Sequence, residues 1–265
     1  MSQAASWDAL TLENVSLTFN AGKPNEYRAL AGTSITIRRG EFYCLLGPSG
    51  CGKSTILNLV AGFLRPDSGS IRMGNREIEG ANTDRVVVFQ DVTNALLPWL
   101  RTYENVEFGL SLQGLPRTET TRRAMAYLEL VGLKDHARKF PYELSGGMKQ
   151  RCQLARALVL EPQVLLMDEP FAALDAITKR IMQKELIRIW QQYRMTVIYI
   201  THDVGEALLL GQKIAIMRRG PASAVKEEFI IDQPYPRMIT DESVAAAYVK
   251  AEASLQAEVG VSLNA

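Results

Sequence analysis

The stretch Gly47-Pro-Ser-Gly-Cys-Gly-Lys53-Ser54 follows a short apolar run, Phe42 to Leu46, and a helical pattern begins at Lys53. It fits the spacing G-x-x-x-x-G-K-[ST], in which glycines let the backbone turn so that several N–H groups face one anion. The positive end of the following helix adds to this attraction. We therefore interpret the stretch as a phosphate-binding P-loop, in which Lys53 reaches the β- and γ-phosphates and the Ser54 hydroxyl ligates Mg²⁺.

Apolar strand patterns and helical patterns alternate around this loop. Alternating or apolar runs predict strands at Thr11–Phe19, Ser34–Ile37, Phe42–Leu46, Ile71–Met73, Val86–Phe89, Val164–Met167, Met195–Ile200 and Lys213–Met217. Helical patterns begin at Lys53 and occupy Ile177–Tyr193 and Val204–Leu210. Strands that alternate with helices indicate an α/β fold with a largely parallel sheet.

We expect a single domain over residues 1–265. Residues 1–92 and 161–236 are predicted to form its core, and the helical periods within 93–160 predict an inserted helical subdomain. The tail, residues 237–265, is Ala-rich and polar, and its sequence is compatible with either a short helix or a frayed end.

The composition of the chain excludes several classes of protein. The 265 residues carry a formal net charge of +1, which does not indicate a nucleic-acid partner. No apolar run reaches the roughly 18 residues that span a bilayer. Because Met1–Leu10 also lacks the features of a signal peptide, we expect a cytoplasmic protein. Cys44, Cys51 and Cys152 fit no metal-ligand spacing and are expected to be reduced thiols in or near the core.

Polar side chains follow three of the predicted strands. The apolar run from Val164 ends in Asp168 and Glu169, where a carboxylate beside a P-loop is suited to hold Mg²⁺ and a second one to accept a proton from water. His202 follows another strand, at the sheet edge where ligands bind in such folds, although a lone histidine is more often structural. Gln90 follows a third strand, and its amide is within reach of the same metal or water.

A second glycine-rich helix start occurs at Leu144-Ser145-Gly146-Gly147. A serine before two glycines at a helix N-terminus makes a second anion site. Together with the P-loop, these motifs resemble the ATP-binding subunits of ABC transporters from about Thr11 to Asp232. The resemblance implies an α/β fold with a P-loop NTPase (RecA-like) core, an inserted helical subdomain and an antiparallel β portion near the N-terminus.

The resemblance also implies a role for each motif. Leu144–Met148 is similar to the LSGGQ signature, although Met148 replaces the usual Gln, and Ala173-Leu-Asp175 is similar to the D-loop. Glu169 is implied as the catalytic base, Gln90 as the Q-loop glutamine and His202 as the switch histidine. The implied Mg²⁺ ligands are Ser54, Gln90 and Asp168. The implied ATP-binding residues are Gly47, Pro48, Ser49, Gly50, Cys51, Gly52, Lys53, Ser54, Thr55, Phe19, Ser145, Gly146 and Gly147.

Phe19 occupies the position at which the family stacks an aromatic ring on adenine, and Tyr27 is a weaker candidate; either ring is otherwise a core aromatic. Asn94-Ala-Leu-Leu-Pro-Trp99-Leu resembles the subgroup that imports nitrate, sulfonates and taurine. Residues Leu96–Leu100 are interpreted either as an apolar loop packed on its own domain or as a docking surface for a permease.

By the same resemblance, the chain is an ATPase that forms a homodimer with ATP at the interface and uses Mg²⁺. Its expected partners are transmembrane permease subunits and, through them, a periplasmic or extracellular solute-binding protein, with no nucleic acid. Its expected place is the cytoplasmic face of the inner membrane, as a peripheral subunit. Two alternatives remain: a soluble ABC ATPase of DNA repair or ribosomes, and a P-loop kinase or GTPase. Against the GTPase, the chain lacks the base-reading N-K-x-D motif.

Overall fold

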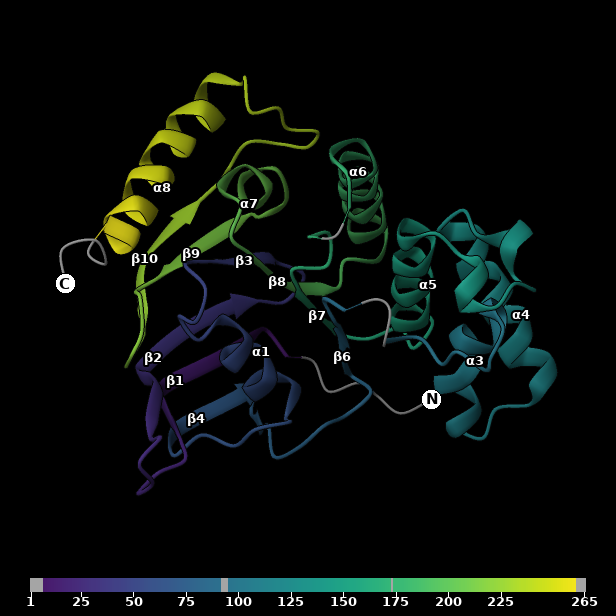
Figure 1. The fold of residues 1–265 in the computed structure, drawn as a ribbon, viewed down its shortest axis with the longest axis horizontal. Helices are drawn as coiled ribbons and strands as arrows, with labels where there is room; N and C mark the ends of the chain where they lie inside the picture. Colours follow the sequence, from purple (N-terminus) through teal and green to yellow (C-terminus); the bar gives the residue numbers. More distant parts are fainter. Residues whose placement is uncertain (1–6, 92–94, 173, 261–265) are drawn as a thin grey trace. The chain divides into compact units, whose positions relative to one another are not determined.

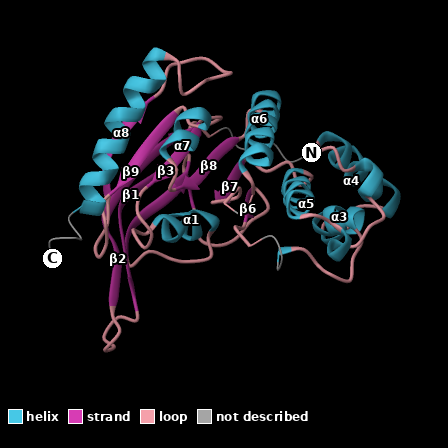
Figure 2. Cartoon of the chain, turned by 45° about the horizontal axis from the view of Figure 1, so that its top comes forward, coloured by secondary structure: helices cyan, strands magenta, loops and turns pink. Residues whose placement is uncertain are grey.

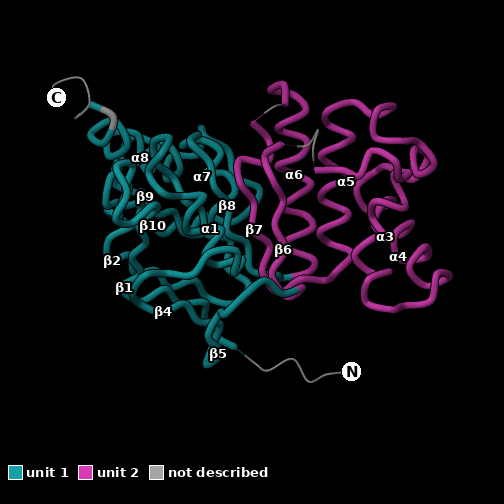
Figure 3. The backbone as a smooth tube through the Cα atoms, turned by 60° about the horizontal axis from the view of Figure 1, so that its bottom comes forward, with its two compact units in different colours: residues 1–82, 194–265 teal, residues 83–193 magenta. Residues whose placement is uncertain are grey.

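The computed structural model describes residues 7–91, 95–172 and 174–260 (Figure 1). Contacts between Cα atoms group the chain into two compact units, which Figure 3 distinguishes by colour. The first unit comprises Met1–Asn82 with Arg194–Ala265, and the second comprises Thr83–Tyr193. This grouping differs from the core and helical subdomain expected from the sequence, and that functional division stays a prediction.

An antiparallel sheet in the first unit contains β1 (Ala9–Phe19), β2 (Tyr27–Arg38), β4 (Ser68–Met73) and β5 (Arg76–Glu77), in the order β2-β1-β4-β5. Strand β2 is longer than the predicted Ser34–Ile37 because it pairs with β1 along its whole length, from Phe19 opposite Tyr27 to Ala9 opposite Arg38. The expected antiparallel β portion near the N-terminus is therefore present.

The parallel strands of the same unit carry the P-loop. Strand β3 (Phe42–Leu46) lies between β8 (Thr196–Thr201) and β9 (Lys213–Met217) and is parallel to both. Strand β10 (Val225–Ile230), which the sequence patterns did not predict, pairs antiparallel with β9. All residues of β3 and β8 are buried, as is typical of parallel strands covered on both faces (Figure 2).

The described residues of this unit also form helices α1 (Lys53–Ala61), α7 (Val204–Leu210) and α8 (Glu242–Gly260). The tail, for which the sequence left two possibilities, forms helix α8. Glu258 of this helix pairs with Lys226 at 2.9 Å and accepts a hydrogen bond from the Arg219 N–H at 3.0 Å. These contacts tie α8 to β10 and to the loop between β9 and β10.

The second unit contains the parallel pair β6 (Arg85–Val88) and β7 (Val164–Asp168) together with several helices. Among its described residues, the long helices are α3 (Thr102–Leu112), α4 (Arg117–Leu130), α5 (Gly146–Leu158) and α6 (Ala176–Tyr193). Turns of 3₁₀-helix occupy Lys134–His136 and Pro141–Glu143. Helices α3, α4 and α5 contact one another, with Val106, Leu110, Ala124, Leu128 and Leu154 buried. The predicted helical stretch is thus observed as a group of packed helices.

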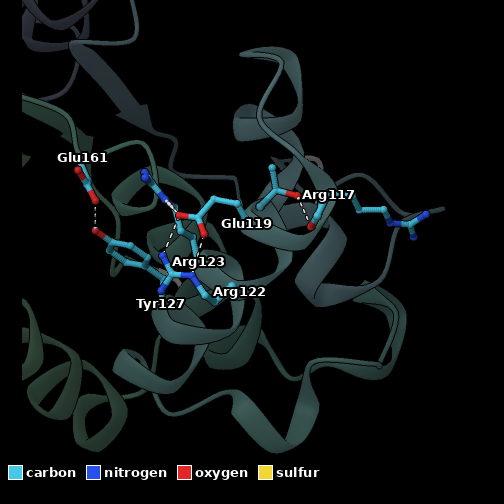
Figure 4. Close-up of polar contacts among 7 residues, drawn as sticks. Arg117, Glu119, Arg122, Arg123, Tyr127 and Glu161 are labelled. Atoms are coloured by element: carbon cyan, nitrogen blue, oxygen red, sulfur yellow. Dashed lines mark hydrogen bonds and ion pairs between the residues drawn. The ribbon is translucent and has the colours of Figure 1, made fainter. Parts of the chain in front are cut away.

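Polar contacts on α4 are shown in Figure 4. Glu119 accepts hydrogen bonds from Arg122 and Arg123, and these bonds lower the pKa of its carboxyl to about 2. Tyr127, farther along the helix, donates to Glu161 at 3.5 Å.

No described helix combines the length and apolar character that a bilayer crossing requires. All three cysteines are buried free thiols, as expected.

Candidate functional site

The P-loop connects the buried strand β3 to helix α1, as the sequence predicts. Gly52 is the N-cap of α1, so the loop ends where the positive end of the helix dipole begins. The Lys53 ammonium donates hydrogen bonds to the backbone oxygens of Gly47 at 2.7 Å and Pro48 at 2.9 Å. Lys53 is only 6% exposed, and these bonds hold its charge against the loop. Ser54, the next residue, is exposed.

Two glycines of the loop are required by close contacts. At Gly47, a Cβ atom would lie 2.8 Å from the Cys51 sulfur. At Gly52, φ is +87°, and a Cβ atom would lie 2.9 Å from Cδ2 of Leu30. A side chain at either position would therefore require either the loop or the contacting side chain to shift.

The two aromatic candidates lie opposite each other in the β1–β2 hairpin. Phe19 is half-buried at the end of β1, and Tyr27 pairs with it at the start of β2. The Tyr27 hydroxyl donates to the Gly50 carbonyl in the P-loop at 2.9 Å. This bond fixes the hairpin end beside the P-loop, and it could not be predicted from the sequence because the partner is a backbone atom.

His202 directly follows β8, whose last residue, Thr201, pairs in register with Leu46 at the end of β3. Because β3 and β8 are parallel neighbours, His202 and Gly47 begin at the same edge of the sheet. Glu206 of α7 accepts hydrogen bonds from Thr201 at 2.5 Å and from Tyr199 at 2.8 Å. The pKa of Tyr199 is raised well above its ordinary value, mainly because the hydroxyl is buried and secondly because the Glu206 charge is close.

This buried network around Glu206 fixes the backbone on either side of His202. Asp203 is the N-cap of α7 and accepts from the Glu206 N–H at 3.0 Å, while its own N–H donates to the Thr201 hydroxyl at 3.1 Å. Glu206 was not among the residues predicted from the sequence. Its position four residues after His202 in the following helix is a signal that could have identified it.

In the second unit, Gln90 and Asp168 follow neighbouring parallel strands. Val88 of β6 pairs with Met167 of β7, so the segments that carry Gln90 and Asp168 emerge at one sheet edge. Gln90 is exposed, and Asp168 is half-buried at the last position of β7.

Glu169 has a left-handed backbone conformation, with φ of +42°, and its carbonyl accepts from the Ala172 N–H at 3.1 Å. Strained conformations of this kind in residues other than glycine cluster at functional sites. The turn directs the chain away from β7 immediately after Asp168. Asp168 and Glu169 therefore occupy backbone positions of different geometry, as their separate predicted roles require.

The Ser145 motif forms the start of helix α5. Ser145 is the N-cap, and its hydroxyl accepts a hydrogen bond from the Met148 N–H at 3.3 Å. Because this bond uses the backbone of Met148, the replacement of the usual Gln leaves the cap intact. Ser145 and Gly146 are exposed, and a Cβ atom at Gly147 would lie 3.2 Å from Cγ2 of Thr178. The first N–H groups of such a helix have no intrahelical acceptor and are available to an anion.

The D-loop candidate is described only in part, because Ala173 lies outside the described residues. Asp175 accepts hydrogen bonds from the N–H groups of Ile177 at 3.1 Å and Thr178 at 3.0 Å, at the start of α6. Hydrogen bonds from Thr178 lower the pKa of Asp175, and the bond from the Thr178 side chain has the larger effect. The same residue, Thr178, lies against Gly147.

The apolar stretch after Gln90 is divided between core and surface. Asn94 lies outside the described residues, Leu96 is buried, and Trp99 is 69% exposed. Asn105 of α3, itself fully buried, accepts from the Leu97 N–H at 2.8 Å and donates to the carbonyls of Leu97 and Leu100 at 3.0 Å each. Leu96 therefore packs on its own unit, and Trp99 is exposed on a loop that Asn105 holds; the docking role of this loop stays a prediction.

Comparisons with known proteins identify the same family. The family model described as "ABC transporter" matches residues 30–172. The chain is 46% identical over 230 residues to the bicarbonate transport ATP-binding protein CmpD of Synechocystis sp., covering 86% of this chain and 80% of the relative. It is 43% identical over 232 residues to the nitrate import ATP-binding protein NrtD of Synechococcus elongatus, covering 86% and 84%.

A solved structure shares the fold at a TM-score of 0.73 and 29% identity, covering 85% of this chain and all of the other. It is the dimeric post-hydrolysis state of the ATP-binding cassette MJ0796 bound to ADP and Pi. The predicted P-loop NTPase fold is thereby confirmed, and the kinase, GTPase and DNA-repair alternatives lose their support. The chain is a member of the ABC transporter family and an ATP-binding ATPase subunit of that family.

Proposed function

We propose that two copies of this chain close around ATP, each nucleotide held between the P-loop of one copy and Ser145–Gly147 of the other. The observation that carries this proposal is the exposed, serine-capped, glycine-rich start of α5, a second anion site in a chain that already has a P-loop. The dimeric arrangement of the MJ0796 cassette supports it. Hydrolysis then removes the γ-phosphate and lets the pair reopen.

Mg²⁺ fits the oxygen donors that this chain offers. Ser54 is exposed at the start of α1, Asp168 ends β7, and Gln90 follows β6, so each provides a hard oxygen ligand near the end of a strand or the start of a helix. The described residues contain no cluster of three His, Cys, Asp or Glu side chains suited to a metal. When bound, Mg²⁺ neutralises developing phosphate charge.

The remaining roles follow from the chemistry of each side chain. Lys53 binds the β- and γ-phosphates, and Phe19 stacks on adenine. Glu169 accepts a proton from the attacking water, which contributes about a hundred- to ten-thousandfold in rate for a positioned base. His202 bonds the γ-phosphate or holds that water, and the Glu206 network keeps the backbone at His202 in place.

Transport requires membrane-spanning partners, and we assign Trp99 to their docking surface. Trp99 is 69% exposed on a loop that Asn105 holds by several hydrogen bonds, nine residues after Gln90. Exposed aromatic side chains on ordered backbone are typical anchors of protein interfaces. This contact would hold the chain at the cytoplasmic face of the membrane, in line with the membrane transporters named for its relatives.

Replacing Trp99 by alanine tests the docking role. Trp99→Ala should reduce co-purification with the permease and solute uptake, while ATP affinity of the isolated chain stays within about twofold. Leu112→Ala, which removes another exposed apolar side chain (74% exposed) from α3, is the matched control and should leave assembly intact. Loss of ATP binding in Trp99→Ala, or equal loss of assembly in both variants, would reject the docking role.

The transported solute is proposed from the relatives. Nitrate was expected from the sequence, with sulfonates and taurine, whereas bicarbonate was not; the relatives are named for bicarbonate and nitrate. We assign the chain to uptake of a small inorganic oxyanion of this kind, delivered by a solute-binding protein. A deletion strain should grow poorly with nitrate as sole nitrogen source or at low inorganic carbon. Normal growth on both, with loss of growth on taurine as sole sulfur source, would favour the organic sulfonates instead.

A further inference from the structure

One side chain of α5 contacts the backbone immediately before Gln90. The Gln153 amide nitrogen donates a hydrogen bond to the Phe89 carbonyl oxygen at 3.1 Å. Phe89 is the first residue after β6 and the neighbour of Gln90. Helix α5 and strand β6 belong to the same compact unit and contact each other (Figure 3).

The amide of Gln153 is costly for the protein to bury. The residue is 1% exposed, and its Oε1 atom has no hydrogen-bond partner among the described residues. A buried acceptor without a partner destabilises a fold, so an apolar side chain of similar volume would serve packing better. Among the described residues, the side-chain hydrogen bond of Gln153 is the bond to the Phe89 carbonyl, so we attribute the burial of its amide to this contact.

The N-terminus of the same helix is the proposed second anion site. Ser145 caps α5, and Gly146 and Gly147 form its first turn. Gln153 lies eight residues after Ser145, which corresponds to about 12 Å along a helix. If α5 shifts as a rigid element, a displacement at Ser145 would reach the Phe89–Gln90 peptide through the Gln153 bond.

We propose that Gln153 is a positioning residue that couples the Ser145–Gly147 end of α5 to Gln90 of the same chain. The inference rests on the proposed function, in which Ser145–Gly147 bind the ATP of the other copy and Gln90 serves the chain's own ATP. Binding of one nucleotide would then set the position of the glutamine at the other. Gln153 gives the two sites of the dimer a direct mechanical connection without touching either nucleotide.

The test is a double-mutant cycle on ATP turnover, with Gln153→Met and Gln90→Ala as its two changes. Methionine keeps the length and approximate volume of Gln153 but removes the donor to Phe89. Arg151→Met is the matched control, because it removes another hydrogen bond from an α5 side chain to a backbone carbonyl, that of Val131 at 3.3 Å. Of these two hydrogen bonds, only that of Gln153 ends on the residue next to Gln90.

We expect Gln153→Met to lower kcat about two- to tenfold, the effect of one hydrogen bond, with the KM for ATP changed less than about twofold. In the Gln90→Ala background, the same change should alter kcat less than about 1.5-fold, because the group through which Gln153 acts is absent. Arg151→Met should leave kcat unchanged in both backgrounds. The thermal midpoint of Gln153→Met should stay close to that of the parent, since the lost bond and the removed orphan acceptor offset each other.

Unchanged kcat in Gln153→Met, or equal fold-losses in both backgrounds, would overturn the inference. Such results leave the proposed function standing if Gln90→Ala alone still lowers turnover. An unaffected Gln90→Ala would contradict both. If Gln153→Met does not fold, Gln153→Asn, whose amide is one methylene shorter, takes its place in the cycle with the same expected and contradicting results.

Discussion

Replacing Gly52 by alanine should destabilise the fold more than the same replacement at Gly50, although both glycines have a left-handed backbone. At Gly50, φ is +78° and an added Cβ atom meets nothing within 4 Å. At Gly52, φ is +87° and the Cβ atom would lie 2.9 Å from Leu30 Cδ2 and 3.3 Å from the Ala29 carbonyl oxygen. The two variants therefore share the backbone strain and differ in the contact.

The magnitudes separate the two variants. An alanine in the left-handed conformation lowers the free energy of unfolding by about 1–2 kcal/mol. The less flexible unfolded chain offsets roughly 0.4–1 kcal/mol of this, so Gly50→Ala should lower the free energy of unfolding by about 1 kcal/mol. Overpacking adds about 1–3 kcal/mol, which brings Gly52→Ala to about 2–4 kcal/mol. At about 2–4 °C per kcal/mol for a chain of this size, the thermal midpoints should fall by roughly 2–4 °C and 4–16 °C.

Circular dichroism melting without nucleotide measures both midpoints. Leu30→Ala provides a further check, because it removes the side chain that the new Cβ atom would meet. In that background, Gly52→Ala should cost less than it does in the parent. Equal midpoint shifts for Gly50→Ala and Gly52→Ala, or no relief by Leu30→Ala, would show that contact with Leu30 does not shape the P-loop.

Three other outcomes are expected. Lys53→Ala should abolish ATP binding as well as turnover, measured by nucleotide titration, because its charge is held at the P-loop; unchanged affinity would contradict its role. Tyr27→Phe removes the bond to the Gly50 carbonyl and should weaken ATP binding about two- to tenfold, whereas an unchanged Kd would show that this bond does not order the loop. Glu119 has a folded-state pKa of about 2, below its ordinary value, so its stabilising effect is present above about pH 4.5 and is lost as the pH falls toward 2. Glu119→Gln should accordingly have a slightly lower thermal midpoint than the parent at pH 6, and this difference should shrink on acidification. A midpoint difference that stays constant with pH would refute the assignment.

Elements could be predicted from the sequence where a residue pattern and its neighbouring segments indicated the same structure. The glycines and Lys53 of the P-loop identified the turn, and buried runs such as Phe42–Leu46 identified the strands that flank it. The start of β2 at Tyr27 was missed because only Ser34–Ile37 alternates clearly, and the rest of the strand depends on pairing with β1. Strand β10 was missed for a similar reason, since it pairs at a sheet edge and leaves Ile230 exposed.

Contacts between distant residues could not be predicted from local patterns. The bond from Tyr27 to Gly50 and the bond from Gln153 to Phe89 both end on backbone atoms, which leave no trace in the sequence of the partner. Nor could periodicity separate Leu96, which is buried, from Trp99, which is exposed, because neighbouring apolar residues in a loop have no regular direction. The left-handed backbone of Glu169 could not be predicted either, since the residue is not a glycine.

Size-exclusion chromatography of Glu169→Gln with Mg-ATP tests most directly whether two copies share each nucleotide. The substitution keeps the shape of the side chain and removes the base, so turnover should fall about a hundred- to ten-thousandfold while binding persists. The variant should elute as a dimer with ATP and as a monomer with ADP. Adding Ser145→Arg places a bulky side chain at the exposed start of α5, and the double variant should elute as a monomer with either nucleotide. A double variant that still dimerises with ATP would contradict the shared site.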